Sequence, residues 1–248
     1  MKNRYFITFA YHGKNYCGWQ KQPNGISVQE EMEKRLSMKA AHVIEMVAAG
    51  RTDAGVHAKA MTAHFDFEGE LPLDFGYKMN AFLPDDISIL TIFPVKAIAH
   101  ARFSAISRSY EYHISIGKNP FLKDLSWHIY NSLDVEAMNK AASMLFQYNE
   151  FTSFSKLHSD NKTDICNIMK AEFEIREEGL VVFHIKADRF LRNMVRAITG
   201  TLVEVGQGKM TPEQFGEIIQ KKDRSAASMS APAHGLFFVS AEYPEDIL

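Results

Sequence analysis

Short alternating and periodic runs of hydrophobic residues divide the chain into predicted strands and helices. In the first part, the pattern predicts strands at 5–10, 43–49, 60–67 and 87–94, and helices at 27–38 and 74–82. The longer of these helices starts at Ser27, which is followed three residues later by Glu30, the arrangement of a capping box. The order of elements is therefore strand, helix, two strands, helix, strand.

The later part of the chain repeats this order. The pattern predicts strands at 107–116, 169–176, 180–187 and 236–243, and helices at 134–148, at 189–205 and from 211 onward. Both parts follow the βαββαβ order of a ferredoxin-like unit, with one extra helix in the second. We therefore predict an α+β protein with two ferredoxin-like halves, residues 1–99 and 100–248, whose largely antiparallel sheets join around a central cleft.

The composition is that of a globular protein with a core, because 46% of the 248 residues are hydrophobic and 23% are charged. No run of apolar residues is long enough to span a membrane or to act as a signal peptide, so we expect a cytoplasmic protein. The net charge of -2 does not by itself indicate a nucleic-acid binder. Residues 1–60, however, carry nine Lys and Arg against five Asp and Glu, which is compatible with a local basic surface.

The cysteines and histidines do not form a recognisable metal motif. Cys17 and Cys166 are far apart in the sequence, which favours two separate thiols over a disulfide. The ten histidines include no HExxH or HxH arrangement, and no CxxC pair is present. The sequence therefore predicts no metal site.

The loop at 50–58, with the sequence GRTDAGVHA, is the strongest candidate for chemistry. It lies between two predicted strands, where a rigid scaffold can hold a loop for binding or catalysis. Gly50 and Gly55 enclose the charged pair Arg51 and Asp53 and permit backbone conformations that other residues avoid. The alternative is a turn in which Asp53 only bonds the local backbone and Arg51 is solvated. The pattern alone leaves both interpretations open.

Two further sets of residues have both a structural and a functional interpretation. Tyr110 and Tyr112 fall on one face of the strand at 107–116, where they serve either as core or as a stacking surface for bases. Arg189, Arg192 and Arg196 recur at helical spacing, which predicts a shared face on the helix at 189–205. Such a face is either solvated or bound to phosphates and carboxylates.

At these residues the chain resembles the tRNA pseudouridine synthase A family, and the resemblance extends over nearly all of the sequence. The GRTDxGVHA string is highly specific to that family. The other shared landmarks occur in the same order along the chain, at 16–20, 27–29, Asn80, 83–84, 100–112, 151–154, 194–196, Gly200, 204–206 and 235–236. The resemblance implies an isomerase that converts uridine to pseudouridine at positions 38–40 of the tRNA anticodon stem-loop, without a cofactor and as a homodimer.

The resemblance also assigns roles to five residues. Asp53 is implied to be the nucleophile, and Arg196 to pair with its carboxylate. Tyr110 is implied to contact the target base, and Leu236 to supply an aliphatic floor beneath it. Arg51 is implied to hold a phosphate or the flipped nucleotide.

The reaction suits an aspartate. It detaches uracil from ribose C1′ and rejoins it through C5, with no net redox change and no imported group. A carboxylate breaks glycosidic bonds in retaining glycosidases, and aspartate, with a reference pKa of about 3.9, is ionised at neutral pH. Whether the carboxylate attacks uracil C6 or ribose C1′ stays open.

Two other functions compete with this interpretation. A non-catalytic RNA-binding protein on the same scaffold would not need Asp53, but the aromatic signatures of RNA-recognition modules are missing from the sequence. A metal-dependent hydrolase would use Asp53 with His57 and His64. Their spacing across a loop and a strand does not guarantee a shared face.

Overall fold

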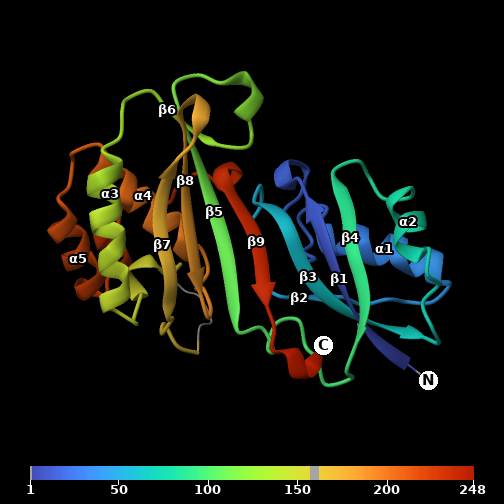
Figure 1. Ribbon diagram of the computed structural model, residues 1–248. Helices are drawn as coiled ribbons and strands as arrows, with labels where there is room; N and C mark the ends of the chain where they lie inside the picture. The colour runs from blue at the N-terminus through green and yellow to red at the C-terminus, as the bar shows by residue number, and fades with distance from the viewer. Residues whose placement is uncertain (1, 157–161) are drawn as a thin grey trace. The chain divides into compact units, whose positions relative to one another are not determined.

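The computed structural model describes residues 2–156 and 162–248 as strands flanked by helices (Figure 1). The chain divides into two compact units. The first consists of Met1–Arg108 and Phe237–Leu248, and the second of Ser109–Leu236. The strand pairs are largely antiparallel, which confirms the predicted α+β class.

In the first unit, strands β4, β1 and β3 are neighbours in that order, and both β2 and β9 pair with β3. The β9 pairing is parallel, at His57 and Phe237, and the others are antiparallel. The helices α1 and α2 lie together on one side of β4 (Figure 1). The elements of this unit are β1 (Lys2–Tyr11), α1 (Val28–Ala40), β2 (Val47–Ala48), β3 (His57–Glu68), α2 (Phe75–Asn80), β4 (Ile87–Val95) and nearly all of β9 (Leu236–Glu242).

The helix α1 forms as the sequence predicts. The side chain of Ser27 caps it by accepting a hydrogen bond from the backbone N–H of Glu30 at 3.1 Å. Its apolar residues Val28, Met32 and Leu36, four positions apart, are all fully buried. The capping serine and the buried stripe therefore fix the helix start and its orientation toward the sheet.

The predicted strand at 43–49 is shortened to the two residues of β2 because side chains from α1 occupy its backbone groups. Glu33 accepts from the N–H of Met46 at 2.8 Å, and Gln29 donates to the carbonyl of Met46 at 3.1 Å. Ser37 accepts from the N–H of Ile44 at 2.8 Å. Ile44, Met46, Ala48 and Ala49 are buried, whereas Val43 and Val47 are exposed, and helix side chains replace part of the strand ladder.

A polar cluster ties the far end of β3 to the loop at 96–104. Arg4 forms a two-pronged pair with Asp66 at 2.8 and 2.9 Å and donates to the carbonyl of Ala99 at 3.0 Å. His64 accepts through Nδ1 from the backbone N–H of Ala101 at 3.1 Å. Burial is the main cause that lowers the pKa of His64 to about 4, with smaller contributions from Arg4 and His100.

We expect this cluster to make stability depend on pH. Folded His64 stays neutral down to about pH 4, whereas the unfolded chain binds a proton near the ordinary value of 6.5. The unfolded state therefore holds more protons in this window, and the free energy of unfolding falls as the pH drops from 6.5 to 4. The loss is on the order of 1–2 kcal/mol once solvent screening is allowed for.

The measurement is urea unfolding at pH 6.5 and 4.5, compared between the wild type and His64→Asn. Asparagine keeps an acceptor near the Nδ1 position but does not titrate. The variant is expected to lose less stability than the wild type over this interval, and an equal loss in both proteins would contradict the assignment.

In the second unit, β5, β8 and β7 are neighbours in that order, and the short strand β6 runs parallel to β5. The predicted hairpin is confirmed by the antiparallel pairing of β7 with β8. Three helices, α3, α4 and α5, group together beside β7 and β8 (Figure 1). The elements are most of β5 (Ser107–Ile116), then β6 (Trp127–Ile129), α3 (Val135–Ser143), β7 (Ile168–Ile175), β8 (Leu180–Ala187), α4 (Met194–Gly206) and α5 (Pro212–Lys221).

The predicted helix at 189–205 begins later than expected, at Met194. Asn193, directly before it, has a φ of 67°, a left-handed conformation that interrupts a right-handed helix. Arg189 and Arg192 therefore precede α4, and the prediction that they share a helical face with Arg196 was wrong.

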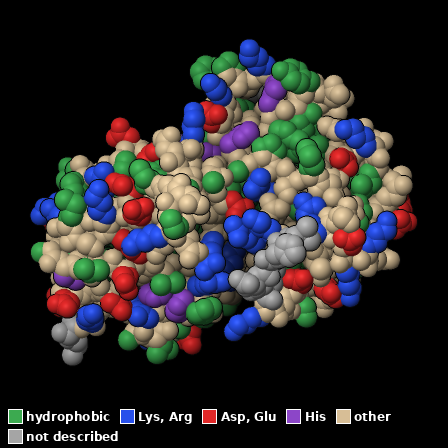
Figure 2. Space-filling model, turned by 180° about the vertical axis from the view of Figure 1, so that it is seen from behind, with side chains coloured by type: hydrophobic (Ala, Val, Ile, Leu, Met, Phe, Trp, Pro, Cys, Tyr) green, Lys and Arg blue, Asp and Glu red, His purple; other side chains and the backbone are tan. Residues whose placement is uncertain are grey.

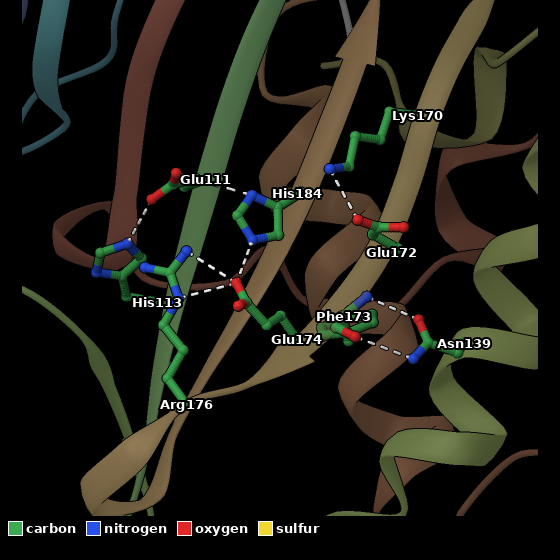
Figure 3. Close-up of polar contacts among 9 residues, drawn as sticks. All are labelled: Glu111, His113, Asn139, Lys170, Glu172, Phe173, Glu174, Arg176 and His184. Atoms are coloured by element: carbon green, nitrogen blue, oxygen red, sulfur yellow. Dashed lines mark hydrogen bonds and ion pairs between the residues drawn. The ribbon is translucent and has the colours of Figure 1, made fainter.

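In each unit an asparagine on a helix binds the backbone of the outermost strand, which is β4 in the first unit and β7 in the second. In α2, Asn80 donates to the carbonyl of Ile89 in β4 at 2.8 Å and accepts from its N–H at 2.7 Å. In α3, Asn139 makes the same pair of bonds with Phe173 in β7, at 3.1 and 2.7 Å (Figure 3). Each amide side chain thus satisfies both backbone groups of one edge-strand residue.

Candidate active site

Asp53 lies in the loop between β2 and β3, with its side chain half-buried, and Arg51 is exposed beside it. The N–H of Val56 donates to the carbonyl of Asp53 at 3.1 Å and closes a tight turn. Gly55 has a φ of 79° in this turn, a conformation that residues with a side chain rarely adopt. The loop backbone around Asp53 is therefore specified by the glycine and by its own hydrogen bond.

A second loop, formed by residues 12–20, packs against the loop at 50–58. A Cβ atom on Gly13 would lie 2.0 Å from the carbonyl oxygen of Val56, and one on Gly18 would lie 2.4 Å from that of Thr52. The N–H of Trp19 also donates to the Thr52 carbonyl at 3.1 Å. Any side chain at either glycine would displace the loop that carries Asp53.

Buried polar side chains complete this support. The hydroxyl of Tyr11 lies 2.7 Å from the hydroxyl of Thr52, and both residues are buried. His57 accepts through Nδ1 from the N–H of Gly13 at 3.0 Å, and its ring stacks on Phe237 with the ring centres 4.7 Å apart. Because Nδ1 is an acceptor, the neutral ring carries its proton on Nε2.

Arg108 anchors the start of the same loop. Its guanidinium donates to the carbonyl of Ala49 at 3.2 and 3.3 Å, to that of Ala105 at 3.0 Å, and to that of Arg102. Ala49 precedes the first glycine of the loop, and its own N–H donates to Thr62 in β3 at 2.8 Å. The loop at 50–58 is thus held at its start, at Thr52 and at its end.

Tyr110 belongs to the second unit and lies on the buried face of β5. As predicted, Tyr110 and Tyr112 share this face, Ile114 follows them on it, and all three are buried. The ring of Tyr110 packs edge-on against Phe190, with the ring centres 5.1 Å apart. Its ring orientation is therefore set by an aromatic neighbour.

Arg196 and Leu236 are linked by the segment at 229–235. Arg196 donates through Nε to the carbonyl of Ala231 at 2.8 Å, and its own carbonyl accepts from the Ala231 N–H at 2.9 Å. Tyr112 donates from its hydroxyl to Pro232 at 2.7 Å, and a Cβ on Gly235 would lie 2.7 Å from the Tyr112 ring. The segment is thus fixed by α4 and β5, and it leads directly to Leu236, which is buried at the start of β9.

The opposite face of β5 carries a chain of charged contacts in the second unit (Figure 3). Glu111 contacts His113 at 3.0 Å and His184 at 3.7 Å, and His184 contacts Glu174 at 3.0 Å. Hydrogen bonds from His184 and Arg176 lower the pKa of Glu174. Since Glu111 and His113 alternate with Tyr110 along the strand, this cluster points away from the candidate residue.

The five candidate residues are divided between the units. Arg51 and Asp53 belong to the first, and Tyr110, Arg196 and Leu236 to the second. Sequence reasoning did not assign a role to Tyr11, Gly13 or Thr52. The signal that would have found the supporting loop is a pair of glycines, Gly13 and Gly18, directly after a buried strand, the same pattern that singled out the loop at 50–58.

A metal site is not found within 2–156 and 162–248, where no group of three or more His, Cys, Asp or Glu side chains is arranged to hold an ion. The two histidines that the alternative hydrolase would use bind the backbone instead. Nδ1 of His57 and Nδ1 of His64 each accept a hydrogen bond from a backbone N–H group. The geometry therefore gives no support to a metal-dependent hydrolase built on Asp53.

The surface carries charges of both signs. The face drawn in Figure 2 shows Lys and Arg side chains as well as Asp and Glu side chains at the surface. No helix in the described part of the chain has the length and hydrophobicity needed to cross a membrane.

Comparison with known proteins identifies the chain. A family model described as tRNA pseudouridine synthase matches residues 7–104 and 141–244, which include every candidate residue except Tyr110. The tRNA pseudouridine synthases A of Bacteroides fragilis and Bacteroides thetaiotaomicron are 53% and 54% identical to it, each over 98% of this chain and over 98% and 92% of their own. That of Francisella tularensis subsp. novicida is 41% identical over 99% of this chain and 95% of its own.

The family match covers most of both units and defines a pseudouridine synthase, which is an isomerase by reaction type. Together with the near full-length similarity of the relatives, it confirms the resemblance read from the sequence. The chain belongs to the tRNA pseudouridine synthase A family.

Proposed function

We propose that this chain converts uridine to pseudouridine at positions 38–40 of the tRNA anticodon stem-loop, with Asp53 as the nucleophile and without a cofactor. The observation that carries the proposal is the loop at 50–56. It presents a half-buried carboxylate on a backbone that three separate contacts hold in place. Such a group is pre-positioned for one chemical task, because little reorganisation is needed when substrate binds.

The proposed reaction needs only what this chain carries. The N1–C1′ bond of uridine breaks, the ring turns, and a C5–C1′ bond forms, while the proton on C5 is lost and N1 gains one. Asp53 provides the electron pair for a transient bond to either uracil C6 or ribose C1′, and that bond breaks again and returns the pair to the carboxylate before the product leaves. The product is an isomer of the substrate, so no oxidant, reductant or group donor enters the balance.

The other candidate residues receive roles from the family resemblance. Tyr110 is proposed to stack against the flipped base, which offsets a few kcal/mol of unstacking. Arg196 is proposed to pair with the Asp53 carboxylate, and Leu236 to form the floor under the base. Arg51 is exposed, which suits a contact with phosphate or with the flipped nucleotide.

We also propose that the fold consists of two ferredoxin-like halves, 1–99 and 100–248, around a central cleft. The first unit supports this through the element order β1, α1, β2, β3, α2, β4 and the neighbour order β4, β1, β3, β2. In the second, β5, α3, β7 and β8 follow one another, with β8 between β5 and β7. From the family resemblance we also propose that the protein is a cytoplasmic homodimer and that each tRNA contacts both copies.

The test is incubation of the purified protein with unmodified tRNA, followed by mapping of pseudouridine at nucleotide resolution. We expect product at positions 38–40 alone, and equal product on an isolated anticodon stem-loop in excess EDTA. Product at other positions would contradict the proposed site. Activity that EDTA removes and zinc alone restores would contradict the proposed chemistry.

Tyr110→Phe is expected to separate stacking from proton transfer. The substitution keeps the ring and its edge contact with Phe190, so tRNA binding should stay within about twofold of the wild type. If the hydroxyl aids proton transfer, turnover falls by about 10²-fold or more. Stem-loop binding and single-turnover rates measure the two effects. A variant that loses binding to the same extent as turnover would contradict the stacking role.

A further inference from the structure

We propose that Tyr11 is a positioning residue for catalysis: through its bond to Thr52 it fixes the loop backbone that orients the Asp53 carboxylate. The inference rests on the proposed role of Asp53 as the nucleophile. Tyr11 is the last residue of β1, and Thr52 directly precedes Asp53. The bond therefore joins the rigid sheet of the first unit to the residue next to the proposed nucleophile.

The burial of this bond makes it a strong constraint. Tyr11 is 4% exposed and Thr52 is 8% exposed, and their hydroxyl oxygens are 2.7 Å apart. Water has little access to such a buried pair. The hydrogen bond between the two hydroxyls is therefore not replaced by hydrogen bonds to water, as happens at the protein surface. Removing one hydroxyl would leave the other without this buried partner.

Thr52 is held by its backbone as well as by its side chain. Its carbonyl accepts from Trp19, and Gly18 allows the supporting loop to approach that carbonyl closely. On the other side of Asp53, its own carbonyl accepts from Val56. The Asp53 side chain turns about only two bonds, so the backbone on both sides determines where its carboxylate lies.

A second tyrosine on the same strand provides a matched comparison. Tyr5 is 8% exposed, and its hydroxyl accepts a hydrogen bond from the N–H of Leu71 at 3.0 Å. Tyr5 and Tyr11 thus have similar burial, and the hydroxyl of each contacts a loop. They differ in the loop that they hold, because Leu71 adjoins none of the candidate residues.

The experiment measures single-turnover pseudouridine formation, KM and stem-loop binding for Tyr11→Phe, Tyr5→Phe, Thr52→Val and Thr52→Ser. We expect Tyr11→Phe to lower kcat by roughly 10- to 100-fold, since a displacement of about 1 Å costs up to that factor, with KM and Kd within about twofold of the wild type. Tyr5→Phe should lower thermal stability to the same extent and leave kcat within about twofold.

The Thr52 variants test whether the bond itself is responsible. Thr52→Val removes the hydroxyl and should reproduce the Tyr11→Phe defect, whereas Thr52→Ser keeps it and should stay near the wild-type rate. The double variant Tyr11→Phe/Thr52→Val should be no slower than either single variant, because both remove the same interaction. Additive losses in kcat would overturn the proposal, as would a Tyr11→Phe rate equal to that of Tyr5→Phe.

Asp53→Asn in the same assay separates the proposed nucleophile role of Asp53 from the proposed positioning role of Tyr11. An inactive Asp53→Asn together with an unaffected Tyr11→Phe would overturn only the positioning role. An active Asp53→Asn would overturn the proposed nucleophile and the inference that rests on it. If Tyr11→Phe fails to fold, the contrast between Thr52→Val and Thr52→Ser decides the outcome.

Discussion

Asp53→Asn is expected to abolish pseudouridine formation while folding and tRNA binding stay nearly intact. Asparagine has the same shape as aspartate but lacks the negative charge and the nucleophilic oxygen, so only the chemical step is affected. Losing a covalent nucleophile costs several orders of magnitude, and we expect at least about a 10³-fold loss of kcat. Single-turnover formation of pseudouridine on a stem-loop measures the effect, and gel-shift affinity and thermal unfolding measure binding and folding.

Two further variants make this prediction specific. Asp53→Glu should fail as well, because the extra methylene displaces the carboxylate by about 1 Å within a loop that cannot yield. Asp85→Asn, which removes an exposed carboxylate in another loop, should retain full activity. A residual rate for Asp53→Asn within tenfold of the wild type would remove Asp53 from the mechanism.

Arg196→Ala is expected to have the second largest effect. If Arg196 pairs with the half-buried carboxylate, its removal leaves that charge without its cationic partner, at a cost of about 2–3 kcal/mol, below the cost for a fully buried pair. A cost of about 2–3 kcal/mol corresponds to a loss of roughly 30- to 150-fold in activity. The guanidinium interacts favourably only with the ionised carboxylate, so its loss should slow the variant most at low pH. The activity of the variant should therefore rise more steeply than that of the wild type between pH 5 and 9.

Pre-steady-state rates across this pH range measure the effect. Arg189→Ala and Arg192→Ala serve as controls, because both residues precede α4 and Arg192 is exposed. If they contact phosphates, they should weaken binding and reduce its salt dependence without changing the pH profile. A profile for Arg196→Ala that runs parallel to the wild type would show that the pairing with Asp53 is wrong.

Local sequence signals predicted most of the elements, because each depends on residues close together in the chain. Ser27 caps its helix as expected, a helix starts after Thr211 as predicted, and β5 spans the predicted residues. The predicted bounds are wrong where the backbone conformation of one residue, or a side chain distant in sequence, determines where an element begins or ends. A left-handed Asn193 delays α4, and Glu33 takes a backbone group that β2 would have used.

The same reasoning explains what was found of the candidate site. The loop at 50–58 carries its own signal, with two glycines around a charged pair. The residues that support this loop carry no such signal. Tyr11 and Thr52 are 41 positions apart, and the sequence around neither residue indicates a hydrogen bond between them. Periodicity describes which face a residue occupies, and it does not describe which distant residue that face meets.

The asparagines of α2 and α3 have a consequence for how this protein associates. An open sheet edge offers its backbone to any passing strand, which invites aggregation and swapped assemblies. Asn80 and Asn139 occupy that backbone at Ile89 and Phe173, so neither edge can be extended there without breaking two hydrogen bonds. Strand pairing with another chain at Ile89 or Phe173 therefore costs two hydrogen bonds, which disfavours the strand-to-strand pairing that builds fibrils.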